Sequence, residues 1–170
     1  VVKKEIDFYS LEDIRVLIRE IEDEPIRQKT MTLLAVYTAM RRSEILALKW
    51  KDIDFENRRI SINKAAVYAS GAGRVDKGTK TVRSNRVIAM SDTVMKILRE
   101  YKEHQDETRV FLANKWEGSD FVFTNDFGGT LHPDSISRWF RRFIKRKGLK
   151  HITFHGLRHT AATLFLSSGV

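Results

Sequence analysis

Two histidines and an arginine stand together near the C-terminal end of this sequence, in residues 155–160 (HGLRHT). Two adjacent arginines stand far upstream, in residues 38–44 (TAMRRSE). Guanidinium groups from distant parts of a chain can together bind a multi-oxygen anion such as phosphate, because their donors match its oxygens in pairs. A nearby histidine can transfer a proton near neutral pH. These residue types therefore indicate phosphoryl chemistry that needs no metal.

Each of these side chains also has a purely structural interpretation. Arg158 has apolar neighbours in the sequence, and an unpaired buried charge is costly, so a long-range salt bridge to Glu44 or another acid is one alternative. His155 would lie near Arg158 on a helix, but it could equally cap that helix or bond within the core. His159 would point about 100° away from Arg158, and we assign it a structural role.

His151, His155 and His159 follow one another at intervals of four residues, a spacing that would suggest a metal site on a single helix. The β-prone residues 152–154 (ITF) interrupt that spacing. The sequence also contains no His-Glu-x-x-His pattern, so we expect no metal site.

The composition is that of a folded protein. The chain has 170 residues, a length typical of one domain, and 42% of them are hydrophobic. It contains no cysteine, which excludes disulfides and thiolate metal sites and fits a reducing compartment. No apolar run approaches the roughly 20 residues of a membrane span, and no signal peptide is evident. Because residue 1 is not methionine, we expect the chain to be part of a longer protein.

The positive charge is unevenly spread. The net charge is +9, and residues 132–150 contain seven basic side chains against a single acid. Residues 1–24, by contrast, contain eight acids and four bases. One-sided positive charge indicates nucleic-acid binding, although a solvated basic face would have the same composition.

Apolar residues at helical spacing and local capping signals predict most of the elements. The expected helices follow Ser10, run from Pro25 toward Met40, start at Ser43, follow Ser91 or Asp92, and span 133–148 and about 157–166. Residues 59–68 and 86–90 are expected to form strands, with a loop at 69–74. The predicted fold class is α+β, mostly helical, with a small antiparallel β-sheet.

Lys77 and Lys80 stand just before the second predicted strand, in residues 76–81 (DKGTKT). A lysine on a hairpin can reach into a cleft and donate a proton. The alternative is an ordinary exposed loop lysine.

Taken together, these features resemble a known family. Residues 38–54 (TAMRRSEILALKWKDID) resemble the first arginine box of the tyrosine recombinases, also called phage integrases. Residues 155–163 (HGLRHTAAT) resemble their His-x-x-Arg box, and Lys80 stands where the family has its β-hairpin lysine. The resemblance covers essentially the whole chain in order, and it implies the catalytic-domain fold of the DNA breaking-rejoining enzymes.

The resemblance also implies roles for these residues. Arg41 and Arg158 would bind the scissile DNA phosphate and stabilise its pentacoordinate transition state. His155 would assist by hydrogen bonding or proton transfer. Lys80 would protonate the leaving 5′-oxygen, with Lys77 as second choice.

Further residues would support the site or bind DNA. Glu44 would orient its neighbours. The side chains expected to contact DNA are Arg42, Lys77, Arg83, Arg138, Arg141 and Arg142. No metal or nucleotide cofactor is expected, because a covalent protein–DNA bond retains the energy for rejoining. The implied partner is double-stranded DNA, bound by a tetramer of the full-length protein, with accessory DNA-bending proteins. The implied location is the bacterial cytoplasm, in association with the nucleoid, for a protein encoded by a bacterium or a phage.

One departure from the family concerns the nucleophile, a tyrosine that follows the His-x-x-Arg box. The tyrosines of this chain all precede that box, at Tyr9, Tyr37, Tyr68 and Tyr101. We therefore expect residues 1–170 to be a catalytic-domain fragment without the tyrosine segment or the N-terminal DNA-clamping domain, and inactive alone. The alternative is a non-catalytic DNA-binding module that uses the basic helix 134–147.

Overall fold

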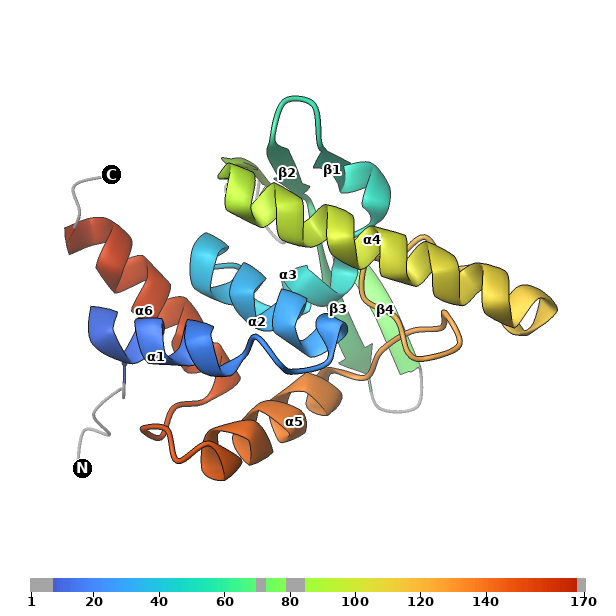
Figure 1. The fold of residues 1–170 in the computed structure, drawn as a ribbon. Helices are drawn as coiled ribbons and strands as arrows, with labels where there is room; N and C mark the ends of the chain where they lie inside the picture. The colour runs from blue at the N-terminus through green and yellow to red at the C-terminus, as the bar shows by residue number, and fades with distance from the viewer. Residues whose placement is uncertain (1–7, 70–72, 79–84, 168–170) are drawn as a thin grey trace. The chain divides into compact units, whose positions relative to one another are not determined.

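The computed structural model describes residues 8–69, 73–78 and 85–167 of the chain (Figure 1). Lys80 and Arg83 lie outside these residues. The chain divides into two compact units. The first comprises Val1–Arg41 and Asp134–Val170, and the second comprises Arg42–Pro133.

The helices of the first unit are α1 (Leu11–Glu20), α2 (Ile26–Thr38), α5 (Pro133–Arg146) and α6 (Phe154–Ser167). Ser10 caps α1 as predicted, and its hydroxyl and the Asp13 carboxylate each accept a backbone N–H of the other residue. The glycine expected to stop α5 is also confirmed, because Gly148 has a left-handed φ of 63° just after the helix. Helix starts and stops were predictable here because their signals are local.

The core of the first unit contains the apolar stripe of α5. Phe140 and Phe143 are fully buried, and the Trp139 ring stacks on Phe143 with centroids 5.1 Å apart. Phe154, the first residue of α6, meets Phe140 edge-on at 5.7 Å. Because this stripe faces inward, the arginines between its residues are directed to solvent.

The second unit contains α3 (Arg42–Ala47), a short 3-10 helix (Trp50–Asp52), a small sheet, a hairpin and α4 (Asp92–Leu112), which is followed by another 3-10 turn (Ala113–Lys115). Ser91 caps α4, as one of the two predicted candidates. The Tyr101 ring of α4 stacks on Phe123, with centroids 5.3 Å apart. The Gln105 amide donates to the Val122 carbonyl at 2.9 Å, so α4 is held against the segment that follows it.

The sheet has the strand order β1-β2-β5, formed by β1 (Ile53–Asp54), β2 (Arg59–Ile62) and β5 (Arg86–Ala89). Its antiparallel pairing of β2 with β5 confirms the two predicted strand regions. A separate hairpin pairs β3 (Lys64–Ala69) with β4 (Gly73–Gly78). The predicted loop at 69–74 is wrong at Ala69, Gly73 and Arg74, which belong to the paired strands. The sequence of β4 has few β-prone residues, so this strand depends on pairing with β3.

Three helix boundaries differ from the predictions. α2 ends at Thr38 rather than at Met40, because Ala39 adopts a left-handed conformation. Ser43 lies inside α3, which starts at Arg42 and ends before Trp50. α6 starts at Phe154, three residues earlier than expected, because the Thr153 hydroxyl accepts the Gly156 N–H at 3.0 Å and so caps the helix. Within the described ranges, no helix is both long and apolar enough to span a membrane.

Tyr9 precedes α1 and is almost completely buried. Its hydroxyl donates to the Lys150 carbonyl, and its backbone N–H donates to the Thr160 hydroxyl at 3.0 Å. Burial, with a smaller contribution from the Asp13 carboxylate, raises the pKa of Tyr9 from 10.0 to about 12. The folded state thus favours the neutral phenol, which is a poor state for a nucleophile.

This pKa makes the stability of the chain depend on pH in alkaline solution. The stabilisation is fully present below pH 10, where the unfolded phenol is neutral, and is lost as pH rises through about 12, where the folded phenol ionises. We expect the free energy of unfolding to fall by roughly 2 kcal/mol more between these values in the wild type than in Tyr9→Phe. Urea unfolding at a series of pH values measures this difference, and a difference that stays constant with pH would contradict it.

Candidate active site

Arg158 lies on α6 and is half-buried. Its Nη1 donates a hydrogen bond to the backbone carbonyl of Ala39 at 2.9 Å, across 119 residues of sequence. Ala39 follows α2 directly and precedes Arg41 by two residues. The first unit therefore brings the His-x-x-Arg segment beside the chain that leads into the first arginine box.

The backbone between α2 and Arg41 has an unusual conformation. Ala39 has φ 52° and ψ 25°, which is left-handed and costs a residue with a Cβ about 1 kcal/mol. Met40 is then buried, and its N–H donates to the Thr38 hydroxyl at 3.2 Å. The next residue, Arg41, is exposed. A buried Met40 thus leaves the Arg41 side chain on the surface of the unit.

His155 lies in the first turn of α6 and is exposed. Its ring meets that of His159 edge-on, with centroids 5.0 Å apart, one helical turn further along. Gly156, which lies between them in the sequence, fits this position because it has no side chain: a Cβ there would lie 2.6 Å from Cγ1 of Ile152. The two histidines therefore share one face of α6, and His159 is half-buried on it.

α6 starts earlier than predicted, so His155 lies within it, but His151 still lies outside the helix. Residues 151–153 precede the helix, as the β-prone sequence predicted, so His151 is not in helical register with His155. Among the residues that the structure describes, no group of three or more His, Cys, Asp or Glu side chains could hold a metal ion.

Glu44 lies on α3 with its side chain only 1% exposed. Both of its carboxylate oxygens accept hydrogen bonds from Arg86, from Nη1 at 3.0 Å and from Nη2 at 2.9 Å. Arg86 is the first residue of β5. This bidentate pair therefore joins α3 to the sheet of the second unit, and it accounts for a carboxylate buried so completely.

Of the two candidate lysines, Lys77 is exposed on β4, opposite Ala65 of β3. Lys80, the first choice for the general acid, lies outside the described residues, as does the predicted DNA contact Arg83. The β4 strand ends at Gly78, two residues before Lys80.

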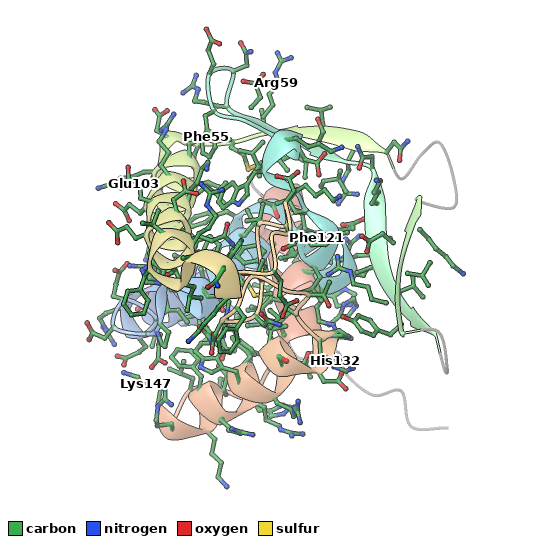
Figure 2. The ribbon with its side chains drawn as sticks, turned by 90° about the vertical axis from the view of Figure 1, so that its right-hand side faces the viewer. Phe55, Arg59, Glu103, Phe121, His132 and Lys147 are labelled. Carbon is green, nitrogen blue, oxygen red and sulfur yellow. The ribbon has the colours of Figure 1, made fainter. Side chains whose placement is uncertain are left out.

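The remaining predicted DNA contacts occur in both units. Arg42 is half-buried at the start of α3 in the second unit. In the first unit, the predicted contacts Arg138, Arg141 and Arg142 are all exposed on α5. The C-terminal end of α5 interacts with acids instead, because Arg146 pairs with Glu24 and Lys147 pairs with Glu20. Lys145 is exposed as well, so the positive face of α5 runs from Arg138 to Lys145, and Figure 2 labels Lys147 just after the helix.

Comparison with known proteins identifies the family. The sequence profile of the phage integrase family matches residues 8–170. The chain therefore belongs to the phage integrase family.

Curated relatives include a tyrosine recombinase XerC-like protein of Caldanaerobacter subterraneus, which is 28% identical over 99% of this chain and 46% of its own length. The ICEBs1 integrase of Bacillus subtilis is 29% identical over 98% of this chain and 45% of its own length. The chain thus spans about half the length of the curated relatives it matches.

Solved structures show the same fold. The Tn1549 transposon integrase in complex with transposon right end DNA aligns with a TM-score of 0.85 at 20% identity, over 99% of this chain and 56% of that chain. The XerA recombinase aligns with a TM-score of 0.72 at 22% identity, over 96% of this chain and 50% of that chain. The prediction of a mostly helical α+β fold with small antiparallel sheets, as in recombinase catalytic domains, is confirmed.

Sequence reasoning missed three features, one in the first unit and two in the second. These are the Ala39 carbonyl that accepts from Arg158, the pairing of Arg86 with Glu44, and the burial of Arg74 in the second unit. The first two join segments more than forty residues apart, so no local pattern could have found them. A lone arginine in a glycine-rich stretch, as at position 74, gives no sign of burial.

The Glu44–Arg86 pair makes an asymmetric prediction about stability. Arg86→Ala removes two charge-assisted hydrogen bonds from a carboxylate that is only 1% exposed, and we expect it to cost about 3–5 kcal/mol. Glu44→Gln should cost less, because the Arg86 side chain is 31% exposed and water can reach it. Chemical denaturation of both variants and of Glu44→Leu/Arg86→Met measures this order, and the double variant should lose less stability than Arg86→Ala. Equal losses in the two single variants would contradict it.

Proposed function

We propose that this chain is the catalytic part of a site-specific DNA recombinase, an integrase that cuts and rejoins double-stranded DNA through a covalent 3′-phosphotyrosyl intermediate. The observation that carries the proposal is the hydrogen bond from Arg158 to the Ala39 carbonyl, two residues before Arg41. Membership of the phage integrase family supports it, as does the fold shared with an integrase in complex with DNA.

In the proposed reaction, a tyrosine hydroxyl attacks the scissile phosphorus, and the bond from phosphorus to the 5′-oxygen breaks. Arg41 and Arg158 bind the non-bridging oxygens, whose negative charge grows in the pentacoordinate transition state. His155 assists by hydrogen bonding or proton transfer. Lys80 donates the proton that the departing 5′-oxygen takes up, and Lys77 is the second candidate. Rejoining runs the same steps in reverse.

By the resemblance to the tyrosine recombinases, we assign the nucleophile to a tyrosine that follows the His-x-x-Arg box, and three of the four phenols within the chain are engaged in other contacts. The Tyr9 and Tyr101 side chains are buried, and the Tyr68 hydroxyl donates to the Leu131 carbonyl at 3.0 Å.

We treat residues 1–170 as one catalytic domain that is inactive without the nucleophile. We propose a tetramer on DNA for the full-length protein, accessory DNA-bending proteins and action on bacterial DNA in the cytoplasm. Glu44 supports the site through its pair with Arg86.

The proposed roles can be separated by changing the leaving group. A recombinase that contains this chain and its tyrosine should form a covalent adduct with a nicked suicide substrate, visible as a shifted band on a denaturing gel. We expect Arg41→Ala and Arg158→Ala to slow adduct formation by about 100-fold or more, because each removes a donor to the transition state. Lys80→Ala should be about 100-fold slow on ordinary DNA. It should recover when a sulfur atom replaces the bridging 5′-oxygen, because a thiolate leaves without a proton.

In the same assay, the two arginine variants should stay slow on the sulfur substrate. A better leaving group does not replace a side chain that binds the phosphate. Adduct formation at the wild-type rate in either arginine variant would refute the phosphate-binding assignment. If Lys77→Ala is rescued by sulfur and Lys80→Ala is not, the general acid is Lys77.

The second candidate function is a DNA-binding module without chemistry, and the observation that favours it is the exposed basic face of α5. Arginines on one face of a helix can bind phosphates without any catalytic group. Both functions require DNA binding by the chain, but only the recombinase forms a covalent adduct.

The salt dependence of DNA binding tests the α5 face. We expect the affinity of the chain for duplex DNA to fall with salt. In the triple variant Arg138→Ala/Arg141→Ala/Arg142→Ala, the log–log slope should weaken by about 0.9 for each phosphate that these arginines neutralise. The matched control is Arg15→Ala/Arg19→Ala, which removes exposed arginines of α1 that pair with acids in the same unit. Fluorescence anisotropy measures both slopes. An unchanged slope in the triple variant would exclude α5 as the DNA-binding face.

A further inference from the structure

α6 carries the residues of the His-x-x-Arg box close to its start. The helix begins at Phe154, so His155 and Arg158 lie near its N-terminal end, and Thr160 follows Arg158 by two residues. Because each residue turns a helix by about 100°, Arg158 and Thr160 point to nearly opposite sides of α6. One side is held by the bond from Arg158 to the Ala39 carbonyl at 2.9 Å. The contacts of Thr160 determine how the other side is held.

Thr160 is buried, and its hydroxyl accepts a hydrogen bond from the backbone N–H of Tyr9 at 3.0 Å. A buried backbone N–H needs an acceptor, and this hydroxyl supplies it. Threonine hydroxyls inside helices often bond to the carbonyl one turn earlier, as Thr163 does with His159 at 2.8 Å. Thr160 differs, because its hydroxyl binds a segment outside α6.

The segment that Thr160 binds is held by contacts that do not involve α6. The Tyr9 side chain is buried, and its hydroxyl donates to the Lys150 carbonyl. Lys150 lies in the connection between α5 and α6, and its ammonium donates to the Phe8 carbonyl at 3.3 Å. These two bonds join residues 8–9 to Lys150 in both directions. Tyr9 is therefore a fixed point against which α6 is held.

Apolar packing alone does not set the rotation of α6. Leu157 and Ala161 are buried, and α6 packs against α2 within the first unit (Figure 1). Burial of apolar surface is non-directional, whereas a hydrogen bond weakens steeply when it is misaligned. A group about 5 Å from the helix axis moves by about 2 Å when the helix rotates by about 20°. A displacement of about 1 Å can slow a reaction by about 100-fold.

We propose that Thr160 is a positioning residue for the scissile phosphate, which fixes the rotation of α6 through the Tyr9 N–H and so places the Arg158 guanidinium. This inference rests on the proposed recombinase function. Thr160 is buried, so in this role it touches neither DNA nor the reacting atoms and acts through Arg158. Its loss would weaken the neutralisation of charge in the transition state and leave the affinity for duplex DNA unchanged.

The experiment compares ordinary DNA with DNA that has a methylphosphonate at the scissile position, in a full-length recombinase that contains this chain and its tyrosine. A methyl group replaces one charged non-bridging oxygen, so the transition state has less negative charge for Arg158 to neutralise. The bonds are otherwise the same, because the Tyr–O–P bond forms, the bond to the 5′-oxygen breaks and that oxygen takes up a proton. A denaturing gel gives the rate of strand cleavage, and fluorescence anisotropy gives the affinity for DNA.

Thr160→Val keeps the shape of the side chain and removes the acceptor. We expect it to cleave ordinary DNA at least about 10-fold more slowly than wild type, with an unchanged Kd for DNA. On the methylphosphonate, its difference from wild type should shrink to about 3-fold or less, and the defect of Arg158→Ala should also shrink. Thr160→Ser keeps the hydroxyl and should cleave both substrates at close to the wild-type rate. The matched control is Thr163→Val, which removes an exposed hydroxyl from the same helix and should match wild type on both.

Tyr9→Phe provides a second test if Thr160→Val does not fold, as judged by circular dichroism. This variant keeps the backbone N–H that Thr160 accepts but loses the bond to the Lys150 carbonyl. The fixed point is then held less firmly, so we expect the same pattern with a smaller size. Cleavage of ordinary DNA should be about 3-fold slower than in wild type, and cleavage of the methylphosphonate should be equal to wild type.

The outcomes separate this inference from the function on which it rests. If Arg158→Ala improves on the methylphosphonate but the variant tested, Thr160→Val or Tyr9→Phe, stays equally slow on both substrates, the residue has only a general structural role and the inference is wrong. Wild-type cleavage of ordinary DNA by that variant, or weaker DNA binding that explains its whole defect, would also overturn it. If Arg158→Ala is equally slow on both substrates or is not slow at all, the phosphate-binding assignment fails, and if wild type forms no covalent adduct, the proposed function itself fails.

Discussion

The site region of the first unit depends on the hydrogen bond between Arg158 and the Ala39 carbonyl. A hydrogen bond from a charged donor contributes about 1.5–3 kcal/mol, more than a neutral one. It compensates for the left-handed conformation of Ala39, which turns that carbonyl out of the line of α2. Because the guanidinium is planar, fixing one of its nitrogens restricts the direction of the others. This contact thus joins two distant segments at the end of α2 and restricts the orientation of a cation.

In the second unit, α3 has a comparable role for a different physical reason. At six residues it is too short to be stable alone, so its stability comes from tertiary contacts. Its contacts include a carboxylate that binds Arg86 and a terminal carbonyl that binds Arg74. One bond uses a side chain and the other uses the backbone, so the two strands attach to α3 independently. The chain enters this helix directly from Arg41, which links it covalently to the first unit.

How much of the fold could be predicted differs between elements for a physical reason. α1 and α5 were predictable because their caps, apolar stripes and stop signals are all local. β4 was not, since its glycines and charges disfavour a strand, and it depends on pairing with β3 and on the contacts of Arg74. The start of α6 was misplaced because Ile152 and Thr153 are β-prone, whereas the Thr153 hydroxyl acts as a cap. Local propensity fails where a single tertiary or capping contact determines the conformation.

The same difference between local signals and tertiary contacts applies to the candidate site. It also affects how the net charge of +9 is interpreted. The family boxes predict Arg41, His155 and Arg158 as site residues, because these types recur at fixed places in a long pattern. Composition counts every arginine alike, yet Arg74 is buried on an aromatic ring while Arg141 is exposed on α5. Only the second kind contributes to a field that attracts DNA, since a buried, paired cation is largely neutralised by its partners. The basic character that first indicated nucleic-acid binding therefore combines two physical roles, and only burial and pairing can separate them.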